Sequence, residues 1–204
     1  MKDQRETIVR KIIPAVALIA LAVVVILLIR RPWVRAEADR PTTKVESDLS
    51  RDASMAAPEF AEGTEWLQSE PLTLASLRGQ VVVVHFWTFG CINCKHNYPV
   101  YKDWQATYAG KGVTLLGIHT PEFEYEAEAT QVRAQAEKHG LKFPIALDAG
   151  GRNWKNWDNR YWPSIYLIDK KGRVRYRWEG ELHLDRADAK QFAGHIDELL
   201  AEKE

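Results

Sequence analysis

The fold is decided by the stretch VVVVHFWTFGCINC, which runs from Val81 to Cys94. Its first half is a continuous run of β-branched and aromatic residues, which is typical of a strand buried on both faces. Its second half places the two cysteines of the chain, Cys91 and Cys94, in one Cys-x-x-Cys at the predicted start of a helix. This spacing sets the sulfurs about one helical turn apart, near enough to form a disulfide with little backbone movement. The stretch therefore predicts a redox-active dithiol.

The two thiols are predicted to have different roles. A helix N-terminus stabilises a thiolate through its unpaired N–H groups and its dipole. Cys91 lies at the exposed end, so it is the predicted nucleophile, and Cys94 is the predicted resolving thiol. A zinc site would need a second ligand pair, and only His96 lies on the same helix. A structural disulfide would close too short a loop to stabilise the fold much. We expect neither a metal nor a cofactor.

Apolar runs and turn signals predict further elements along the chain. Strands are expected at Val113 to His119, Ser164 to Asp169 and Arg173 to Trp178, a short strand or a turn at Phe143 to Leu147, and helices at Cys91 to Tyr108, Glu122 to His139 and Asp185 to Ala201. The order βαβα followed by ββα predicts an α/β fold, with a mixed central sheet flanked by helices on both faces.

The N-terminal part of the chain predicts a membrane anchor. The 18 residues from Ile12 to Ile29 carry no charge and would span roughly 27 Å as a helix, close to the thickness of a bilayer core. We expect a short cytoplasmic N-terminus at 1–11, a transmembrane anchor at 12–30, a flexible linker at 31–57 and the globular domain at 58–204. A cleaved signal peptide is the competing interpretation, because residues 36–38 read Ala-Glu-Ala. The apolar run is longer than the usual signal core of about 7–15 residues, which favours the anchor.

Composition excludes some functions. Lys plus Arg is 28 and Asp plus Glu is 28, and this balance argues against nucleic acid as a partner, because neutralising phosphates needs an excess of basic residues. Two cysteines exclude a scaffold of several disulfides. The Lys and Arg counts on the two sides of the apolar run are nearly equal, so they do not decide the orientation of the anchor.

Three motifs together carry a family resemblance. They are Trp87 to Cys94, Gly117 to Phe123 and Asn159 to Pro163, joined by Pro99 inside the first helix. In this order, over residues 58–204, they resemble the thioredoxin superfamily. Within it the chain looks like the membrane-tethered TlpA/ResA-like thiol-disulfide oxidoreductases. The strongest likeness is to the thioredoxin-like (redoxin) domain of DipZ-type proteins.

The resemblance implies further site residues and a location. It implies a cis Trp162–Pro163 bond with Pro163 against Cys91, and substrate contacts at Trp87 and Trp162. It also implies an insertion over roughly Pro121 to Pro144. The domain would face the periplasm or cell exterior from a bacterial cytoplasmic membrane, as a single-pass protein. DipZ-type proteins carry their own electron-conducting membrane domain, whereas this chain has one predicted anchor, so a separate membrane electron donor is expected.

The chain departs from the family at two positions near the dithiol. His85 stands where many thioredoxins have a buried Asp, and Asn97 stands where ResA-like proteins often have a Glu. The usual carboxylate that accepts the proton of the second thiol is therefore missing. His85 and Glu122 are the candidate replacements. The alternatives are a packed strand histidine and a helix-capping acid, and the sequence leaves both open.

These observations predict a membrane-anchored thiol-disulfide oxidoreductase that reduces protein disulfides outside the cytoplasm. A peroxide-reducing redoxin is one alternative, but a peroxidatic cysteine usually lacks a partner three residues on. A thiol carrier that binds copper or another metal through Cys91, Cys94 and His96 is the other. The pair Ile92-Asn93 between the cysteines does not fix the direction of electron flow.

Overall fold

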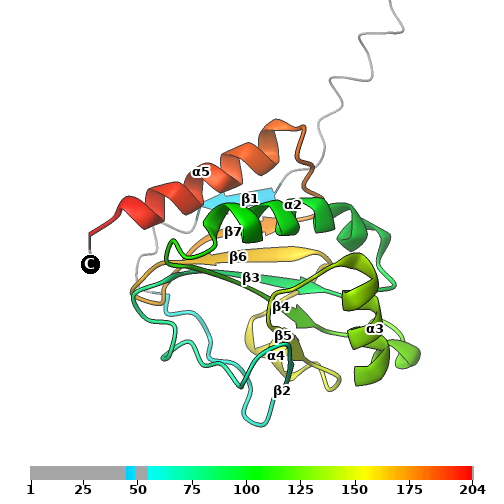
Figure 1. The fold of residues 1–204 in the computed structure, drawn as a ribbon. Helices are drawn as coiled ribbons and strands as arrows, with labels where there is room; N and C mark the ends of the chain where they lie inside the picture. The colour runs from blue at the N-terminus through cyan, green and yellow to red at the C-terminus, as the bar shows by residue number, and fades with distance from the viewer. Residues whose placement is uncertain (1–44, 49–54, 204) are drawn as a thin grey trace, which may run out of the picture. The chain divides into compact units, whose positions relative to one another are not determined.

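The computed structural model of the chain describes residues 55–203 and the backbone of residues 45–48 (Figure 1). In chain order the elements are β1 (Val45–Asp48), β2 (Glu65–Leu67), β3 (Val81–Trp87), α2 (Ile92–Tyr108), β4 (Val113–His119), the 3-10 helix η1 (Glu124–Glu126), α3 (Ala129–His139), β5 (Ile145–Leu147), α4 (Arg152–Asn156), β6 (Ser164–Ile168), β7 (Val174–Glu179) and α5 (Ala187–Ala201). The expected α/β fold with a mixed central sheet is confirmed.

The seven described strands form one sheet in the order β1-β7-β6-β3-β4-β5-β2. β3, β4 and β5 run parallel, and the other neighbouring pairs run antiparallel. In the ladder, Trp87 at the end of β3 pairs with His119 at the end of β4, and Phe86 pairs with Ser164 at the start of β6. Three segments that are far apart in the sequence therefore meet at the carboxyl end of β3, the end at which open α/β sheets bind their ligands.

Successive side chains of β3 enter two hydrophobic cores, one on each face of the sheet, because strand side chains alternate. Val81, Val83 and Trp87 enter the core under α2, α3 and α5, and Val82, Val84 and Phe86 enter the core on the opposite face. Every residue of β3 is buried, which explains why the strand reads as an uninterrupted apolar run. The position of β3 at the centre of the sheet holds the following Cys-x-x-Cys on a rigid support.

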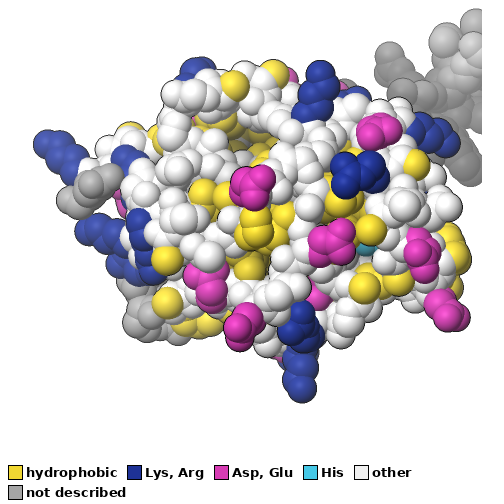
Figure 2. Space-filling model, turned by 60° about the horizontal axis from the view of Figure 1, so that its bottom comes forward, with side chains coloured by type: hydrophobic (Ala, Val, Ile, Leu, Met, Phe, Trp, Pro, Cys, Tyr) yellow, Lys and Arg dark blue, Asp and Glu magenta, His cyan; other side chains and the backbone are white. Residues whose placement is uncertain are grey.

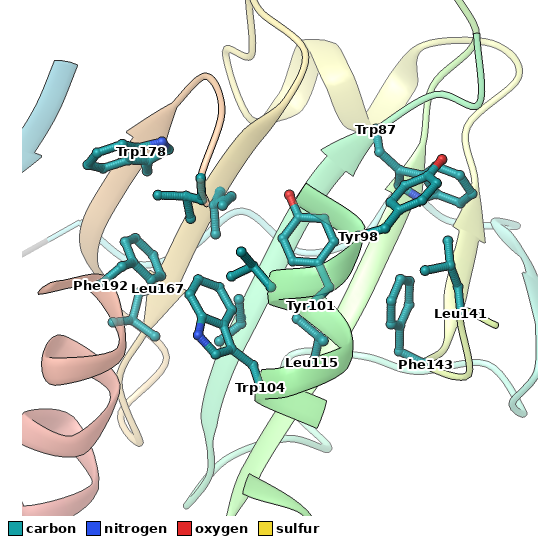
Figure 3. Close-up of a cluster of buried hydrophobic side chains, with 14 of the residues drawn as sticks. Trp87, Tyr98, Tyr101, Trp104, Leu115, Leu141, Phe143, Leu167, Trp178 and Phe192 are labelled. Atoms are coloured by element: carbon teal, nitrogen blue, oxygen red, sulfur yellow. The ribbon is translucent and has the colours of Figure 1, made fainter. Parts of the chain in front are cut away.

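The larger core is rich in aromatic rings (Figure 3). Tyr101 and Trp104 project from α2, and Phe192 from α5 stacks on Trp104 with ring centroids 5.2 Å apart. The smaller core is closed by α4 and by residues from the segment before β3, including Phe60 and Leu74. On the side that carries β2 and α4, hydrophobic side chains gather at the centre and acidic and basic ones surround them (Figure 2).

Gly117 in β4 fits where a larger residue would not. A Cβ atom there would lie 2.7 Å from His85 Cε1 and 2.7 Å from Trp87 Nε1. Both neighbours belong to β3 and are fully buried, so neither ring can move aside freely. The glycine thus lets two large rings of β3 lie over the adjacent strand.

Several elements differ from the sequence expectation. The range 31–57 was expected to hold no regular element, but β1 lies within it and pairs antiparallel with β7, from Val45 opposite Glu179 to Asp48 opposite Tyr176. The expectation is wrong for these four residues, because the open edge of β7 offers backbone groups that they satisfy. The helix expected from Glu122 to His139 is divided into η1 and α3. Gly140 ends α3 as expected, in the left-handed conformation.

The predicted anchor at residues 12–30 lies outside the described residues. Among the residues that the structure describes, none of the helices combines the length and apolar character that crossing a bilayer requires.

Candidate redox site

The dithiol lies at the junction of β3 and α2, as the sequence predicts. Cys91 is the N-cap residue of α2, with an extended backbone, and its Sγ accepts a hydrogen bond of 3.2 Å from the backbone N–H of Cys94. Both cysteines are free thiols. Cys91 is half-buried and Cys94 is fully buried. Only the first thiol is therefore open to a substrate.

The two thiols differ strongly in acidity. A hydrogen bond from the Cys94 thiol lowers the pKa of Cys91 to about 7, with help from the backbone N–H groups of Cys94 and Asn93 and against the opposing effect of partial burial. Burial raises the pKa of Cys94 far above its usual value, and the hydrogen bond to Cys91 raises it further. Near neutral pH, Cys91 thus carries a large thiolate fraction while Cys94 holds its proton. This is the pattern that a nucleophile and a resolving thiol require.

A buried carboxylate, Glu126 in η1, lies next to the dithiol. Its Oε2 accepts hydrogen bonds from Thr88 Oγ1 at 2.7 Å, from the backbone N–H of Glu122 at 2.8 Å and from that of Phe123 at 3.2 Å. Its Oε1 is also buried, and the Tyr125 hydroxyl is the polar side-chain group beside it. The negative charge of Glu126 contributes to the raised pKa of Cys94. Glu126 is thus close enough to Cys94 to act on it electrostatically.

Gly90 leaves the space that Glu126 occupies. A Cβ atom at Gly90 would overlap Glu126 Oε1, so any larger residue there would force the carboxylate to move. Because Gly90 immediately precedes Cys91, the carboxylate lies against the backbone that leads into the dithiol. The sequence does not single out Glu126. Residues 121–128 read PEFEYEAE, and nothing in this alternation distinguishes the one buried glutamate from the exposed ones.

His119 and Thr88 complete this buried polar group. His119 Nε2 lies 3.4 Å from Thr88 Oγ1, whose own proton is given to Glu126. The His119 ring stacks on Phe89, with centroids 5.5 Å apart. Burial lowers the pKa of His119 to about 4, against the opposing charge of Glu126. His119 is therefore neutral at physiological pH and acts as a hydrogen-bond donor to Thr88.

His85 lies in an aromatic part of the core. Its ring meets Tyr101 edge-on at 4.0 Å and Phe143 at 4.7 Å between centroids, and its Nδ1 donates to the backbone oxygen of Leu116 at 3.3 Å. Burial lowers the pKa of His85 to about 3, so the ring is a weak base at neutral pH. This environment corresponds to the alternative of a packed, hydrogen-bonded strand histidine.

Two other predicted site residues lie differently from the expectation. Trp87 is fully buried, with its ring edge-on to His119 at 5.0 Å, so its side chain is closed to solvent, and its role in substrate binding stays a prediction. A strand buried on both faces leaves no room for an exposed terminal ring. Glu122 is exposed, and its charge slightly raises the pKa of Cys91. It acts on the nucleophile, whereas Glu126 acts on the resolving thiol.

Trp162 and Pro163 immediately precede β6. The Trp162–Pro163 peptide bond is cis, as expected. Trp162 is half-buried at the edge of the larger core, as is Cys91. The indole Nε1 of Trp162 donates to the backbone oxygen of Thr120 at 3.1 Å, and the ring packs on Trp154 with centroids 4.1 Å apart. A contact between Pro163 and Cys91 stays a prediction.

Asn97 links α2 to the segment around Pro163. Its Oδ1 accepts from the backbone N–H of Leu182 at 2.6 Å, and its Nδ2 donates to the backbone oxygen of Gly180 at 3.3 Å. The N–H of Gly180 in turn donates to the backbone oxygen of Pro163 at 2.9 Å. A glutamate at this position could not donate to Gly180. Asn97 therefore ties α2 to the Gly180–Leu182 segment through one hydrogen bond that a glutamate carboxylate could not make.

His96, the third ligand considered for a metal, binds Glu181 instead. Its Nδ1 lies 2.9 Å from Glu181 Oε1, and Glu181 Oε2 lies 2.9 Å from His183 Nε2. Within residues 45–48 and 55–203, no group of three or more His, Cys, Asp or Glu side chains is arranged to hold a metal ion.

Comparison with known proteins places this site in a family. The model of the AhpC/TSA family matches residues 54–177. Protein DipZ of Mycobacterium tuberculosis is 41% identical over 128 residues, which cover 61% of this chain and 18% of that protein. The chain spans about a fifth of the length of the first curated relatives it matches.

Solved structures agree with the fold. A thioredoxin-like superfamily protein aligns with a TM-score of 0.66 and 30% identity over 74% of this chain and 99% of that one. A thiol-disulfide isomerase from Corynebacterium glutamicum aligns with a TM-score of 0.61 and 26% identity, over 72% of this chain and 98% of that one.

Proposed function

Because the chain belongs to the AhpC/TSA family and has a thioredoxin-like fold, we propose that it is a thiol-disulfide oxidoreductase that reduces disulfides in proteins. The observation that carries the proposal is the asymmetry of the dithiol. Cys91 is accessible and has a pKa of about 7, whereas Cys94 is buried with a strongly raised pKa. Cys91 is thus ready to attack a substrate disulfide, and Cys94 stays protonated until it resolves the mixed disulfide.

The reaction takes two exchanges. The Cys91 thiolate attacks one sulfur of the substrate disulfide, forming a mixed disulfide and releasing the other substrate sulfur as a thiolate. Cys94 then gives up its proton and attacks Cys91 Sγ. The Cys91–Cys94 disulfide forms, the second substrate sulfur leaves, and two electrons have passed to the substrate.

Glu126 is the proposed acceptor of the Cys94 proton. Its carboxylate is buried, and its charge acts on Cys94. A base placed in a site closed to water avoids waiting for hydroxide, an advantage of about 10²- to 10⁴-fold in such proton transfers. Thr88 and the two backbone N–H groups hold the carboxylate in place.

The acidity of Cys91 supports the reducing direction. Oxidising enzymes of this kind stabilise the reduced form with a nucleophile pKa of about 3.5, whereas thioredoxin, a reductant, has a value of about 7. Cys91 has a pKa of about 7. A reductant must be recharged after each turnover, so a separate electron donor in the membrane is part of the proposal.

The proposed location is the outer face of a bacterial cytoplasmic membrane. Disulfides persist outside the cytoplasm and are scarce within it, and the uncharged run from Ile12 to Ile29 is long enough to span a bilayer. We expect a reporter fused to the C-terminus of the full chain to be active in the periplasm or cell exterior, and the protein to stay in the membrane fraction after carbonate washing. Cytoplasmic reporter activity would contradict this topology.

Reduction of insulin by the full chain in detergent micelles tests the activity. With dithiothreitol as the electron source, the protein should accelerate insulin precipitation, and equilibration with glutathione should give a dithiol potential of about −270 mV. A potential of about −120 mV would instead indicate an oxidant. Hydrogen peroxide consumption faster than insulin reduction would favour the peroxide-reducing alternative.

A further inference from the structure

Two large aromatic side chains stand exposed beside the dithiol. Phe123 is 53% exposed and Tyr125 is 60% exposed. Their rings are nearly parallel, with centroids 5.9 Å apart and an interplanar angle of 7°. Exposed aromatic rings forgo the favourable burial of a large apolar area. Together these two residues form a surface that is called here the aromatic ledge.

The aromatic ledge adjoins the reactive end of α2. The Tyr125 ring lies 5.9 Å from that of Phe89, two residues before Cys91. The Tyr125 hydroxyl oxygen would lie 3.2 Å from a Cβ atom at Gly90. On the other side of Cys91, Ile92 is 61% exposed. A polypeptide whose disulfide reaches Cys91 therefore meets exposed apolar side chains close to the reactive sulfur.

The ledge is surrounded by acids. Glu122, Glu124 and Glu128 are exposed, and residues 121–128 contain no Lys or Arg. The charge of Glu122 acts on Cys91, which places it within electrostatic range of the nucleophile. Arg160, an exposed cation three residues before Pro163, is paired with Asp158 at 3.3 Å. The ledge thus combines apolar area with three exposed carboxylates that are its neighbours in the sequence.

We propose that the aromatic ledge with Glu122, Glu124 and Glu128 selects polypeptide substrates that carry a large apolar side chain next to Lys or Arg beside the reactive cysteine. This inference rests on the proposed function and names its substrate class. Charge complementarity favours the cationic segment and speeds its encounter with the thiolate. The rings receive the apolar side chain, and a small disulfide, which does not reach them, gains neither advantage.

Matched disulfide peptides test the proposal with the reduced full chain. Three peptides of equal length would carry Leu-Lys, Leu-Glu or Gly-Lys beside the cysteine, with oxidised glutathione as the small disulfide. We expect the Leu-Lys peptide to be reduced about tenfold faster than the Leu-Glu peptide at low salt, and this ratio to fall toward one at about 0.5 M salt. The Gly-Lys peptide should be slower than Leu-Lys at both salt concentrations.

Variants separate the two parts of the surface. The double substitution Glu124→Gln and Glu128→Gln should remove most of the Lys-over-Glu preference. Phe123→Ala should remove most of the Leu-over-Gly preference. Met55→Ala is the matched control, because Met55 is 51% exposed but accepts a hydrogen bond from Val174 at the start of β7, the end of that strand far from Pro163. It should leave all rates unchanged.

The outcomes separate this inference from the proposed function. Equal reduction of all three peptides would overturn the selectivity and leave the enzyme activity standing. An equal loss for peptides and glutathione in Phe123→Ala would also overturn it, because the ledge would then act on the dithiol. Failure to reduce even glutathione would reject the proposed function itself.

Discussion

Replacing Cys94 by Ser is expected to trap the protein on its substrate as a stable mixed disulfide. Cys91 keeps its position at the helix N-terminus and still attacks, but no thiol remains to resolve the product. Turnover should fall by more than about a thousandfold, as it does when one member of a covalent machinery is lost. Mass spectrometry of the unreduced protein should show a substrate adduct that dithiothreitol removes.

Cys91→Ser is the matched variant. It should form no adduct and show no turnover, because Cys94 is buried and holds its proton. Alkylation of the reduced wild-type protein by iodoacetamide should increase with pH and level off above a midpoint near 7, where Cys91 is ionised. Capture of substrate by Cys91→Ser but not by Cys94→Ser would reverse the two roles.

Glu126→Gln is expected to slow the second exchange by about 10²- to 10⁴-fold while leaving the first nearly unchanged. Two effects oppose each other. Removing the negative charge lowers the pKa of Cys94, since that charge raises it, but burial is the larger cause and persists. The loss of the proton acceptor therefore dominates. Rapid-quench measurement of the mixed disulfide should show it decaying more slowly than in the wild type.

The pH dependence distinguishes a proton acceptor from a merely structural residue. Without Glu126 the Cys94 proton must go to hydroxide, so the decay of the mixed disulfide should accelerate about tenfold per pH unit. The alkylation midpoint of Cys91 should not move. Glu122→Gln is the control: it should shift that midpoint downward, because Glu122 raises the pKa of Cys91, and leave the decay unchanged. The opposite result would restore Glu122 as the acceptor.

Local sequence signals were sufficient for the centre of the fold. β3 runs from Val81 to Trp87 as predicted, because a buried central strand reads as one apolar run. β2 and α4 were not predicted, since three to five residues give too short a pattern. β1 was missed because its pairing depends on the free edge of β7, which lies more than a hundred residues later.

In the candidate site, too, the sequence indicated the local features but not the long-range contacts. The roles of Cys91 and Cys94 depend on their place at a helix start, which the sequence indicates. The burial of Glu126 depends on Thr88, on two backbone N–H groups and on the absence of a side chain at Gly90. The approaches to Thr88 and Gly90 bring together residues more than thirty positions apart. No periodicity in the sequence encodes them.

The short edge strands of the described sheet affect the release of the product. β1 is four residues long and β2 is three, and both lie at the ends of the strand order (Figure 1). A long open border would capture an extended chain as an additional strand. An enzyme that meets loosely folded substrates would then be inhibited by products that stay bound to its sheet edge. Edge strands of three and four residues offer few backbone hydrogen bonds to such a chain. A reduced substrate can therefore dissociate and fold elsewhere.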